Sequence, residues 1–162
     1  MKTKFQYPFL AVSLTVLTAA FAGTAWADDD DLKLSQTPEA VQATVRDNLR
    51  GGKVDDIDRV QLEGRTMYKV EVDLPDRKGG DDDDLKLYID ADGKLLKSRE
   101  DMAFSALPAA VQTAARNQGG EIEDVERVSA NGTVSYEVEF DDPDLTIVFS
   151  ESGEVMSRKS DD

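Results

Sequence analysis

The chain has 162 residues, and its 34 acidic side chains outnumber its 19 basic ones, which gives a formal net charge of -15 at pH 7. A field of this sign repels nucleic-acid phosphates and anionic lipid headgroups, so we expect no nucleic-acid partner, and membrane surfaces are poor partner candidates. Histidine and cysteine are both absent, which removes the usual general base, the thiolate nucleophile and the common transition-metal ligands. We therefore predict a protein that is not an enzyme and carries no cofactor.

Residues 1–27 have the layout of a secretory signal peptide. Lys2 and Lys4 precede an apolar run at residues 9–21, and Ala-Trp-Ala at residues 25–27 stands just before an acidic block. The run is shorter than the roughly 20 residues that a membrane-spanning helix needs. We therefore expect removal of this segment on export. The product would be a periplasmic or secreted chain with 17 basic and 34 acidic residues and no membrane insertion.

The rest of the chain consists of two copies of one unit. Pro-Glu-Ala-Val-Gln at residues 38–42 returns as Pro-Ala-Ala-Val-Gln at residues 108–112, an offset of 70 residues. After a two-residue deletion, residues 51–60 match residues 119–128 at an offset of 68. Similarity at a nearly fixed offset indicates a duplicated supersecondary unit.

The first repeat is placed at residues 28–102 and the second at residues 103–162. A repeat of about 60 residues is near the lower limit for folding alone. With no cysteine to form a disulfide, stability has to come from packing. We therefore expect the two repeats to share one hydrophobic core.

Each repeat begins with a helical pattern, in which apolar residues recur at i, i+4 and i+8. The two apolar stripes are Val41, Val45 and Leu49, and Leu107, Val111 and Ala115. Pro38 and Pro108 suit a first helical turn, and a Gly-Gly pair after each pattern suits a helix end. We therefore predict one helix at the start of each repeat.

Beyond each helix the apolar period changes to two, as in a half-buried strand. Tyr68, Val70 and Val72 alternate with charged residues, and the second repeat has the same alternation from Tyr136 to Phe140. The preceding strand is irregular, because Val54 and Ile57 are three residues apart. This spacing predicts a β-bulge or kink.

Two more strands complete each repeat. Leu85, Leu87 and Ile89 alternate, and Asp92-Gly93 after them is a strong hairpin signal. We predict an α+β fold of two tandem repeats, each with one helix packed on a four-stranded antiparallel sheet. The helix would cover the apolar face of the sheet, and the other face would stay exposed to solvent.

Acidic segments raise the question of metal binding. Residues 75–84 form an insertion in the first repeat that ends in four aspartates, Asp81 to Asp84, and predicts a solvated loop. Asp90-x-Asp92-Gly93 resembles part of a calcium loop, but Tyr88 and Arg99 would occupy its first and twelfth positions, where carboxylates are needed. We therefore predict a hairpin turn and no dedicated metal site. Weak binding of divalent cations is expected at most, at Asp81 to Asp84 and at Asp141, Asp142 and Asp144.

These motifs resemble the PepSY-like domains of bacterial envelope proteins. The motifs are Pro-x-x-Val-Gln, Gly-Gly, (Ile/Val)-x-x-(Ile/Val)-x-Arg-Val, Tyr-x-Val-Glu and a closing hairpin with glycine. The resemblance covers both repeats, from Leu34 to Lys159, and departs from the family at residues 49–52, where an aromatic residue and a proline often precede the glycine. Such domains are also called beta-lactamase-inhibitor-like, because tandem helix-plus-sheet units form the inhibitor of that enzyme. The resemblance implies this fold and, by analogy of fold, inhibition or modulation of an envelope enzyme or receptor.

Strand alternation also predicts a partner-binding surface on the face of the sheet away from the helices. Its residues are Glu71, Tyr88, Glu137, Glu139 and Val148. An aromatic centre with charges that steer encounter is typical of protein interfaces. We expect a non-enzymatic binding module for an envelope protein with a basic surface. The alternative is an acidic envelope protein that buffers cations or acts in stress.

Overall fold

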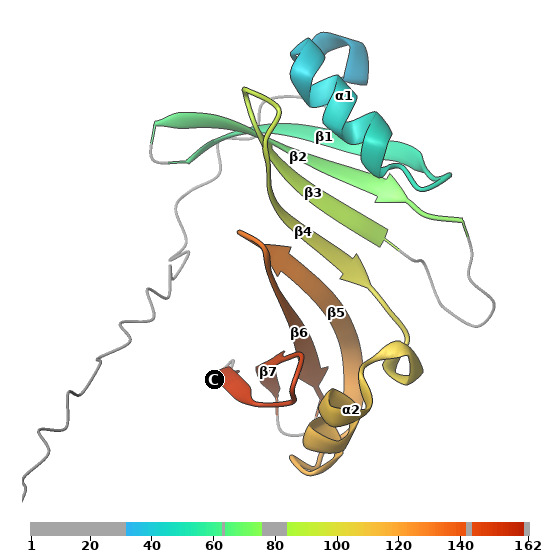
Figure 1. Cartoon of the computed structure of the whole chain (residues 1–162), viewed down its shortest axis with the longest axis vertical. Helices are drawn as coiled ribbons and strands as arrows, with labels where there is room; N and C mark the ends of the chain where they lie inside the picture. Colours follow the sequence, from blue (N-terminus) through green and yellow to red (C-terminus); the bar gives the residue numbers. More distant parts are fainter. Residues whose placement is uncertain (1–31, 63, 76–83, 142–143, 161–162) are drawn as a thin grey trace, which may run out of the picture.

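The computed structural model describes residues 32–62, 64–75, 84–141 and 144–160. They form an α+β fold with two α-helices and one antiparallel sheet of eight strands, which follow one another in chain order (Figure 1). The predicted signal peptide and most of the acidic insertion lie outside the described residues. The elements are α1 Glu39–Asn48, β1 Lys53–Leu62, β2 Arg65–Asp73, β3 Asp84–Asp90, β4 Leu95–Asp101, α2 Ala109–Arg116, β5 Ile122–Ala130, β6 Thr133–Phe140, β7 Leu145–Ser150 and β8 Val155–Ser160.

The Pro-x-x-Val-Gln motif builds the start of both helices. The proline is the N-cap residue, and the valine, Val41 or Val111, is fully buried. The glutamine ties the helix to the chain before it. Gln42 Nε2 donates to the Thr37 carbonyl at 2.8 Å, and Gln112 Nε2 donates to the Leu107 carbonyl at 2.9 Å. The motif therefore has a structural role in both repeats.

The predicted irregularity in the first strand of each repeat is confirmed. The pairing of β1 with β2 shifts register between Val54 and Asp56, and β5 shifts in the same way between Ile122 and Asp124. Because of the extra residue, Ile57 lies opposite Val70 in the helix-covered core although it is three residues from Val54, which packs against that core as well.

The predicted hairpin at Asp92-Gly93 is also confirmed. Gly93 has φ +85°, and Asp90 Oδ1 accepts backbone N–H bonds from Asp92 at 3.1 Å and from Lys94 at 2.8 Å. A Cβ on Gly93 would lie 2.7 Å from Ala40 of α1. The glycine therefore serves both the left-handed turn and the close approach of this turn to the helix.

Most of the buried apolar side chains form two clusters instead of the single core that we expected. One cluster joins α1 to β1, β2 and β3, and the other joins α2 to β5, β6 and β7. The repeats are joined through backbone pairing of β4 with β5, from Lys97–Ala130 to Asp101–Glu126. The expectation of a shared core is therefore wrong, and the two sets of strands form one continuous sheet.

Polar residues at the β4–β5 junction explain this separation. On the helix-covered face of β4, the positions opposite Leu87 and Leu85 are Ser98 and Glu100, both buried. Glu100 forms an ion pair with Arg50, which lies next to the end of α1. The distance from Arg50 Nη1 to Glu100 Oε2 is 2.7 Å. An ion-paired carboxylate and a hydroxyl thus interrupt the apolar layer between the two helices.

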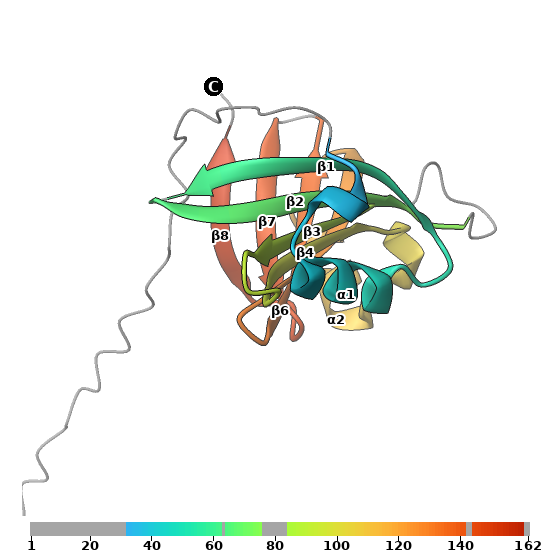
Figure 2. The same ribbon diagram turned by 90° about the horizontal axis from the view of Figure 1, so that it is seen from above.

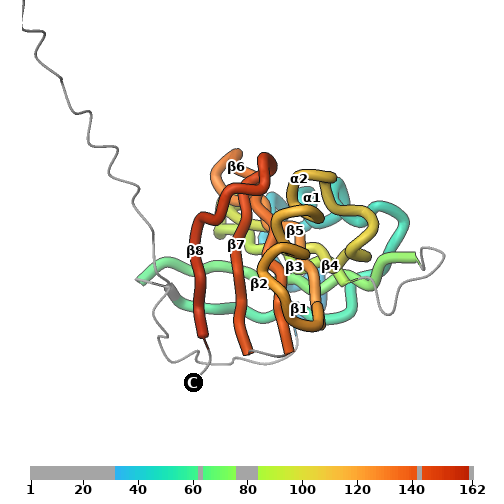
Figure 3. Tube along the Cα trace, turned by 90° about the horizontal axis from the view of Figure 1, so that it is seen from below, coloured from blue at the N-terminus to red at the C-terminus, as the bar shows by residue number. Residues whose placement is uncertain are grey.

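Both helices lie on the same side of the sheet, α1 over β1, β2 and β3 and α2 over β5, β6 and β7 (Figures 1 and 2). The sheet is strongly twisted, and β7 and β8 run steeply across the direction of β1 and β2 (Figures 2 and 3). This change in strand direction across the sheet accumulates from the normal right-handed twist of each strand. The side of the sheet opposite the helices is called the outer face below.

Candidate partner-binding face

Strand register places the predicted residues of the first repeat on the outer face. Val70 and Leu87 are direct partners in the core below α1. Side chains alternate along a strand, so the neighbouring pair Glu71–Lys86 projects from the opposite face. Tyr88, one residue after Leu87, projects from the outer face as well.

The same argument holds for the second repeat. Val138 and Ile147 are partners in the core below α2, so the pair Glu137–Val148 lies on the outer face, and Glu139 lies there too. Because the strands form one sheet, the predicted residues from both repeats share a single continuous surface. All five side chains are partly buried. Their role in binding a partner stays a prediction.

Arg99 of β4 joins the two repeats on this face. Its guanidinium binds Glu126 of β5, with Nε at 2.7 Å from Oε2, and Glu137 of β6, with Nη2 at 2.9 Å from Oε1. Burial by itself would lower the pKa of Arg99, but hydrogen bonds and attraction from the two carboxylates outweigh burial and raise it. Arg99 therefore stays charged, and Glu137 has a structural partner.

Lys69 has a similar position within the first repeat. Its Nζ lies 2.7 Å from Glu71 and 3.4 Å from Asp58. Burial opposes the charge of Lys69, but Glu71 and Asp58 together raise the pKa of the ammonium. The Glu71 carboxylate is therefore already paired within the chain.

Tyr88 lies beside a second cation. The Lys97 ammonium sits 5.5 Å from the centroid of the Tyr88 ring, within the range of a cation–π interaction. Burial and the nearby Arg99 lower the pKa of Lys97, and Glu137 and Glu126 offset this in part. The aromatic centre of the face is thus flanked by an ammonium that the strand alternation did not single out.

The outer face is less uniformly exposed than the alternation predicts. Glu126 of β5 is only 7% exposed, because the side chain of Arg99 extends from the adjacent strand β4 and binds it. Val128, directly opposite Arg99, is buried as well, and the long arginine stem can cover such a neighbour. Val60 and Met67 are also buried and lie directly opposite each other, so each covers part of its partner.

One acidic cluster lies at the end of the β4–β5 junction. Carboxylate oxygens of Asp101, Asp124 and Glu126 lie within 4.8 Å of one another. Burial, together with repulsion from Glu126 and Asp124, raises the pKa of Asp101 to about 6, although Lys86 opposes the shift. These residues could hold a divalent cation weakly, but Arg99 already neutralises Glu126. Of the aspartates that we expected to bind cations weakly, Asp81 to Asp83 and Asp142 lie outside the described residues.

Sequence reasoning missed Arg99, Lys69 and Glu126 as organisers of this face. The pairing of Arg99 depends on strand β5 lying beside β4, which two separate sheets would not provide. Lys69 did carry a signal, because it stands two residues before Glu71 on one predicted strand, and Asp58 stands on the strand before it. Only the register of those strands turns this signal into a contact.

Comparison with known proteins identifies the family. A family model described as "Putative beta-lactamase-inhibitor-like, PepSY-like" matches residues 17–97 and 98–157. The two matches cover most of the chain, so the chain belongs to the PepSY-like family. The resemblance that the repeated motifs indicate is thereby confirmed. No curated protein matches the sequence.

Solved structures share this fold at low sequence identity. A BLIP-like protein from Bacteroides fragilis has a TM-score of 0.58 and 17% identity over 77% of this chain and 86% of that protein. A DUF2874 family protein from Bacteroides uniformis has a TM-score of 0.56 and 20% identity over 76% of this chain and 89% of its own. A protein from Bacteroides eggerthii, described among "putative periplasmic proteins", has a TM-score of 0.50 and 16% identity over 76% of this chain and 88% of its own.

No helix among the described residues is long and apolar enough to cross a membrane.

Proposed function

We propose that the chain is an exported, non-enzymatic protein-binding module that acts in the periplasm or outside the cell. In this proposal two PepSY-like units, each of one helix and four strands, present one outer face to a partner. The observation that carries the proposal is the continuity of the sheet, which puts Tyr88 of the first repeat and Val148 of the second on one surface.

The composition of the outer face supports a protein partner. Tyr88 and Val148 supply partly exposed aromatic and apolar area, and the carboxylates of Glu71, Glu137 and Glu139 lie on the same face. Interfaces combine such anchors with a charged periphery that steers encounter. The net charge of -15 favours a partner with a basic surface.

Membership of the PepSY-like family also supports a protein-binding function. The family description is inhibitor-like, and one structural neighbour is a BLIP-like protein. We therefore propose that binding inhibits or modulates an enzyme or receptor of the cell envelope. Fold alone does not name the target, which has to be identified by its contact with the outer face.

The test compares capture of envelope proteins by three forms of the exported chain. Val148→Lys adds a positive charge on the outer face, and Ala43→Lys adds the same charge on the exposed side of α1. We expect the unmodified chain and Ala43→Lys to capture the same stoichiometric partner and Val148→Lys to lose it. Equal capture by all three would place the binding surface elsewhere. No captured partner, together with tight calcium binding by calorimetry, would favour cation buffering.

A further inference from the structure

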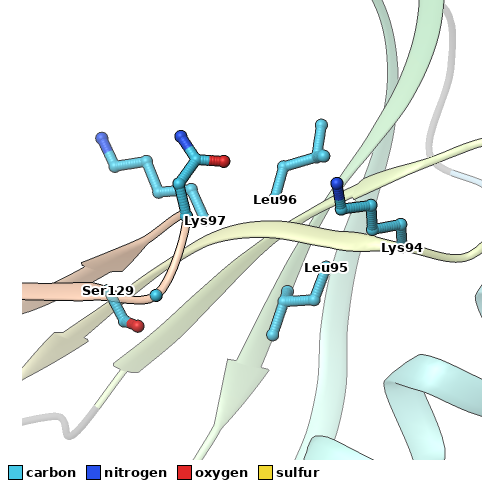
Figure 4. A pocket seen from close by; sticks show the side chains of 7 residues that line it. Lys94, Leu95, Leu96, Lys97 and Ser129 are labelled. Atoms are coloured by element: carbon cyan, nitrogen blue, oxygen red, sulfur yellow. The ribbon is translucent and has the colours of Figure 1, made fainter.

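A groove with a volume of about 350 Å³ lies where the two repeats meet (Figure 4). One wall is the segment Lys94–Lys97 at the start of β4, and the other is Ser129, Asn131 and Gly132 at the end of β5. The volume is at the lower end of the range for small-ligand sites, roughly 300 to 1,000 Å³. It can therefore hold one or two residues of a peptide.

The groove exists because β4 extends further than its partner. The pairing of β4 with β5 ends at Lys97–Ala130. Asn131 and Gly132 then turn the chain away into β6, with φ +53° and +79°. No residue of β5 pairs with the start of β4 in the described chain. A short length of strand edge is thus open beside a hairpin turn.

A β-bulge shapes the wall formed by β4. Tyr88 pairs with Lys97 and Ile89 pairs with Leu95, so Leu96 is an extra residue. Figure 4 shows Lys94, Leu96 and Lys97 on one side of the strand and Leu95 on the other. Two ammonium groups therefore flank an apolar side chain. Bulges often redirect side chains in this way at binding sites.

The chemistry of the groove favours an anion with an apolar part. The lining has two ammoniums, a hydroxyl and an amide but no carboxylate, although acidic residues outnumber basic ones 34 to 19 in the chain. Within the described residues, neither Lys94 nor Lys97 forms an ion pair. Burial lowers the pKa of Lys97, and a bound anion would offset that cost.

We propose that this groove binds the free C-terminal end of a partner polypeptide. A segment that runs along the open edge of β4 must stop at the Asn131–Gly132 turn, because β5 occupies the rest of the edge. A chain end fits this stop without having to turn away from the sheet. The lysines select the carboxyl end over the amino end, with its carboxylate beside Lys97 and an apolar last side chain against Leu96. The groove shares Lys97 with the outer face, where its ammonium lies beside Tyr88, but a free peptide tests the groove without a partner on that face.

The test measures fluorescence anisotropy of a labelled peptide, Ser-Ala-Ser-Ala-Ala-Leu, with the full exported chain. The same peptide with an amidated C-terminus tests the carboxylate. We expect saturable binding of the free acid and at least about tenfold weaker binding of the amide, because a hydrogen-bonded charge is lost. Lys94→Gln with Lys97→Gln should weaken the free acid by a similar factor. Lys53→Gln, at the exposed start of β1, changes one charge far from the groove and should bind normally.

A second readout separates specific binding from general attraction. NMR titration of the Lys97 side chain should show its pKa rising when the free-acid peptide binds and staying unchanged with the amide. Equal binding of acid and amide, or equal weakening by Lys53→Gln, would overturn the proposal. Displacement of the peptide by inorganic phosphate at similar concentrations would also overturn it, because the groove would then recognise charge alone.

Discussion

The two repeats neutralise the same acidic position on the outer face in different ways. Asp58 of β1 and Glu126 of β5 are equivalent at the offset of 68 residues. Asp58 is paired by Lys69 of the adjacent strand β2. The residue equivalent to Lys69 is Glu137, so the second repeat places two carboxylates opposite each other and takes its cation, Arg99, from β4 of the first repeat.

This difference assigns different roles to the two repeats. The first repeat contains the charges that balance its own outer face. The second repeat depends on the first for the guanidinium that holds Glu126 and Glu137 together. The β4–β5 junction is therefore a place where the two halves of the sheet are electrostatically coupled, although their apolar cores are separate.

The largest expected effect follows from cutting the chain between the repeats. Residues 28–102 keep α1, their core and the Lys69 pairs, whereas residues 103–162 lose Arg99 and leave Glu126 directly opposite Glu137. Like charges at such positions destabilise a sheet. We expect a cooperative urea transition for the first fragment and none for the second at neutral pH, measured by circular dichroism. Equal stability of both fragments would contradict the asymmetry.

A single substitution should reproduce part of this effect. Arg99→Gln leaves Glu126, which is 7% exposed, as a buried carboxylate without its guanidinium. Removing one partner of a buried pair typically costs about 3 kcal/mol of unfolding free energy. The urea midpoint of the intact chain measures this loss. The double variant Arg99→Gln with Glu126→Gln should recover much of it, and no recovery would mean that Arg99 acts mainly through packing.

Asp101 makes the junction sensitive to pH. Its pKa of about 6 in the folded chain lies above the ordinary aspartate value, so the folded state binds the proton more tightly than the unfolded state. The penalty of the ionised carboxylate is present above pH 6 and disappears as pH falls toward the ordinary value. Because Asp101 is partly exposed, we expect a gain of about 1 kcal/mol from pH 7 to pH 4.

Thermal unfolding of Asp101→Asn across this range isolates the effect of that carboxylate. The variant should be more stable than the unmodified chain at pH 7, and the difference should shrink as pH falls. A constant difference between the two curves would show that Asp101 is not the titrating group.

The smallest effect is expected in the first repeat. Lys69→Gln removes the cation beside Asp58 and Glu71, whose side chains are 24% and 28% exposed. Water can solvate these carboxylates, so the loss should be below about 1 kcal/mol. Chemical denaturation of Lys69→Gln and Arg99→Gln side by side provides the comparison. A larger loss for Lys69→Gln would reverse the assigned roles.

The sequence predicted the local structure well because each element carries its own pattern. The valines of the Pro-x-x-Val-Gln motifs, the spacing of Val54 and Ile57, and the Asp92-Gly93 turn all act within a few residues. The joining of the repeats could not be predicted in this way. β4 contains Ser98, Arg99 and Glu100 instead of alternating apolar residues, so neither its faces nor its second partner strand carries a periodic signal.

The candidate face was predicted to a similar extent. Alternation placed Glu71, Tyr88, Glu137, Glu139 and Val148 on one side of their strands, as the register shows. Their partners Lys69, Lys97 and Arg99 depend on distances between strands, which alternation does not give. The expected shared core rested on the size of one repeat, and it failed because a continuous sheet supports both repeats without merging their cores.

The most direct test of the account is site-specific photocrosslinking on the outer face. A photoreactive phenylalanine analogue replaces Tyr88 in one form, Val148 in a second and Thr113, on the exposed side of α2, in a third. A single binding surface on the outer face predicts that the first two forms crosslink to the same envelope protein and that the third does not. Crosslinking from Thr113 alone would show that the helices, and not the continuous outer face, bind the partner.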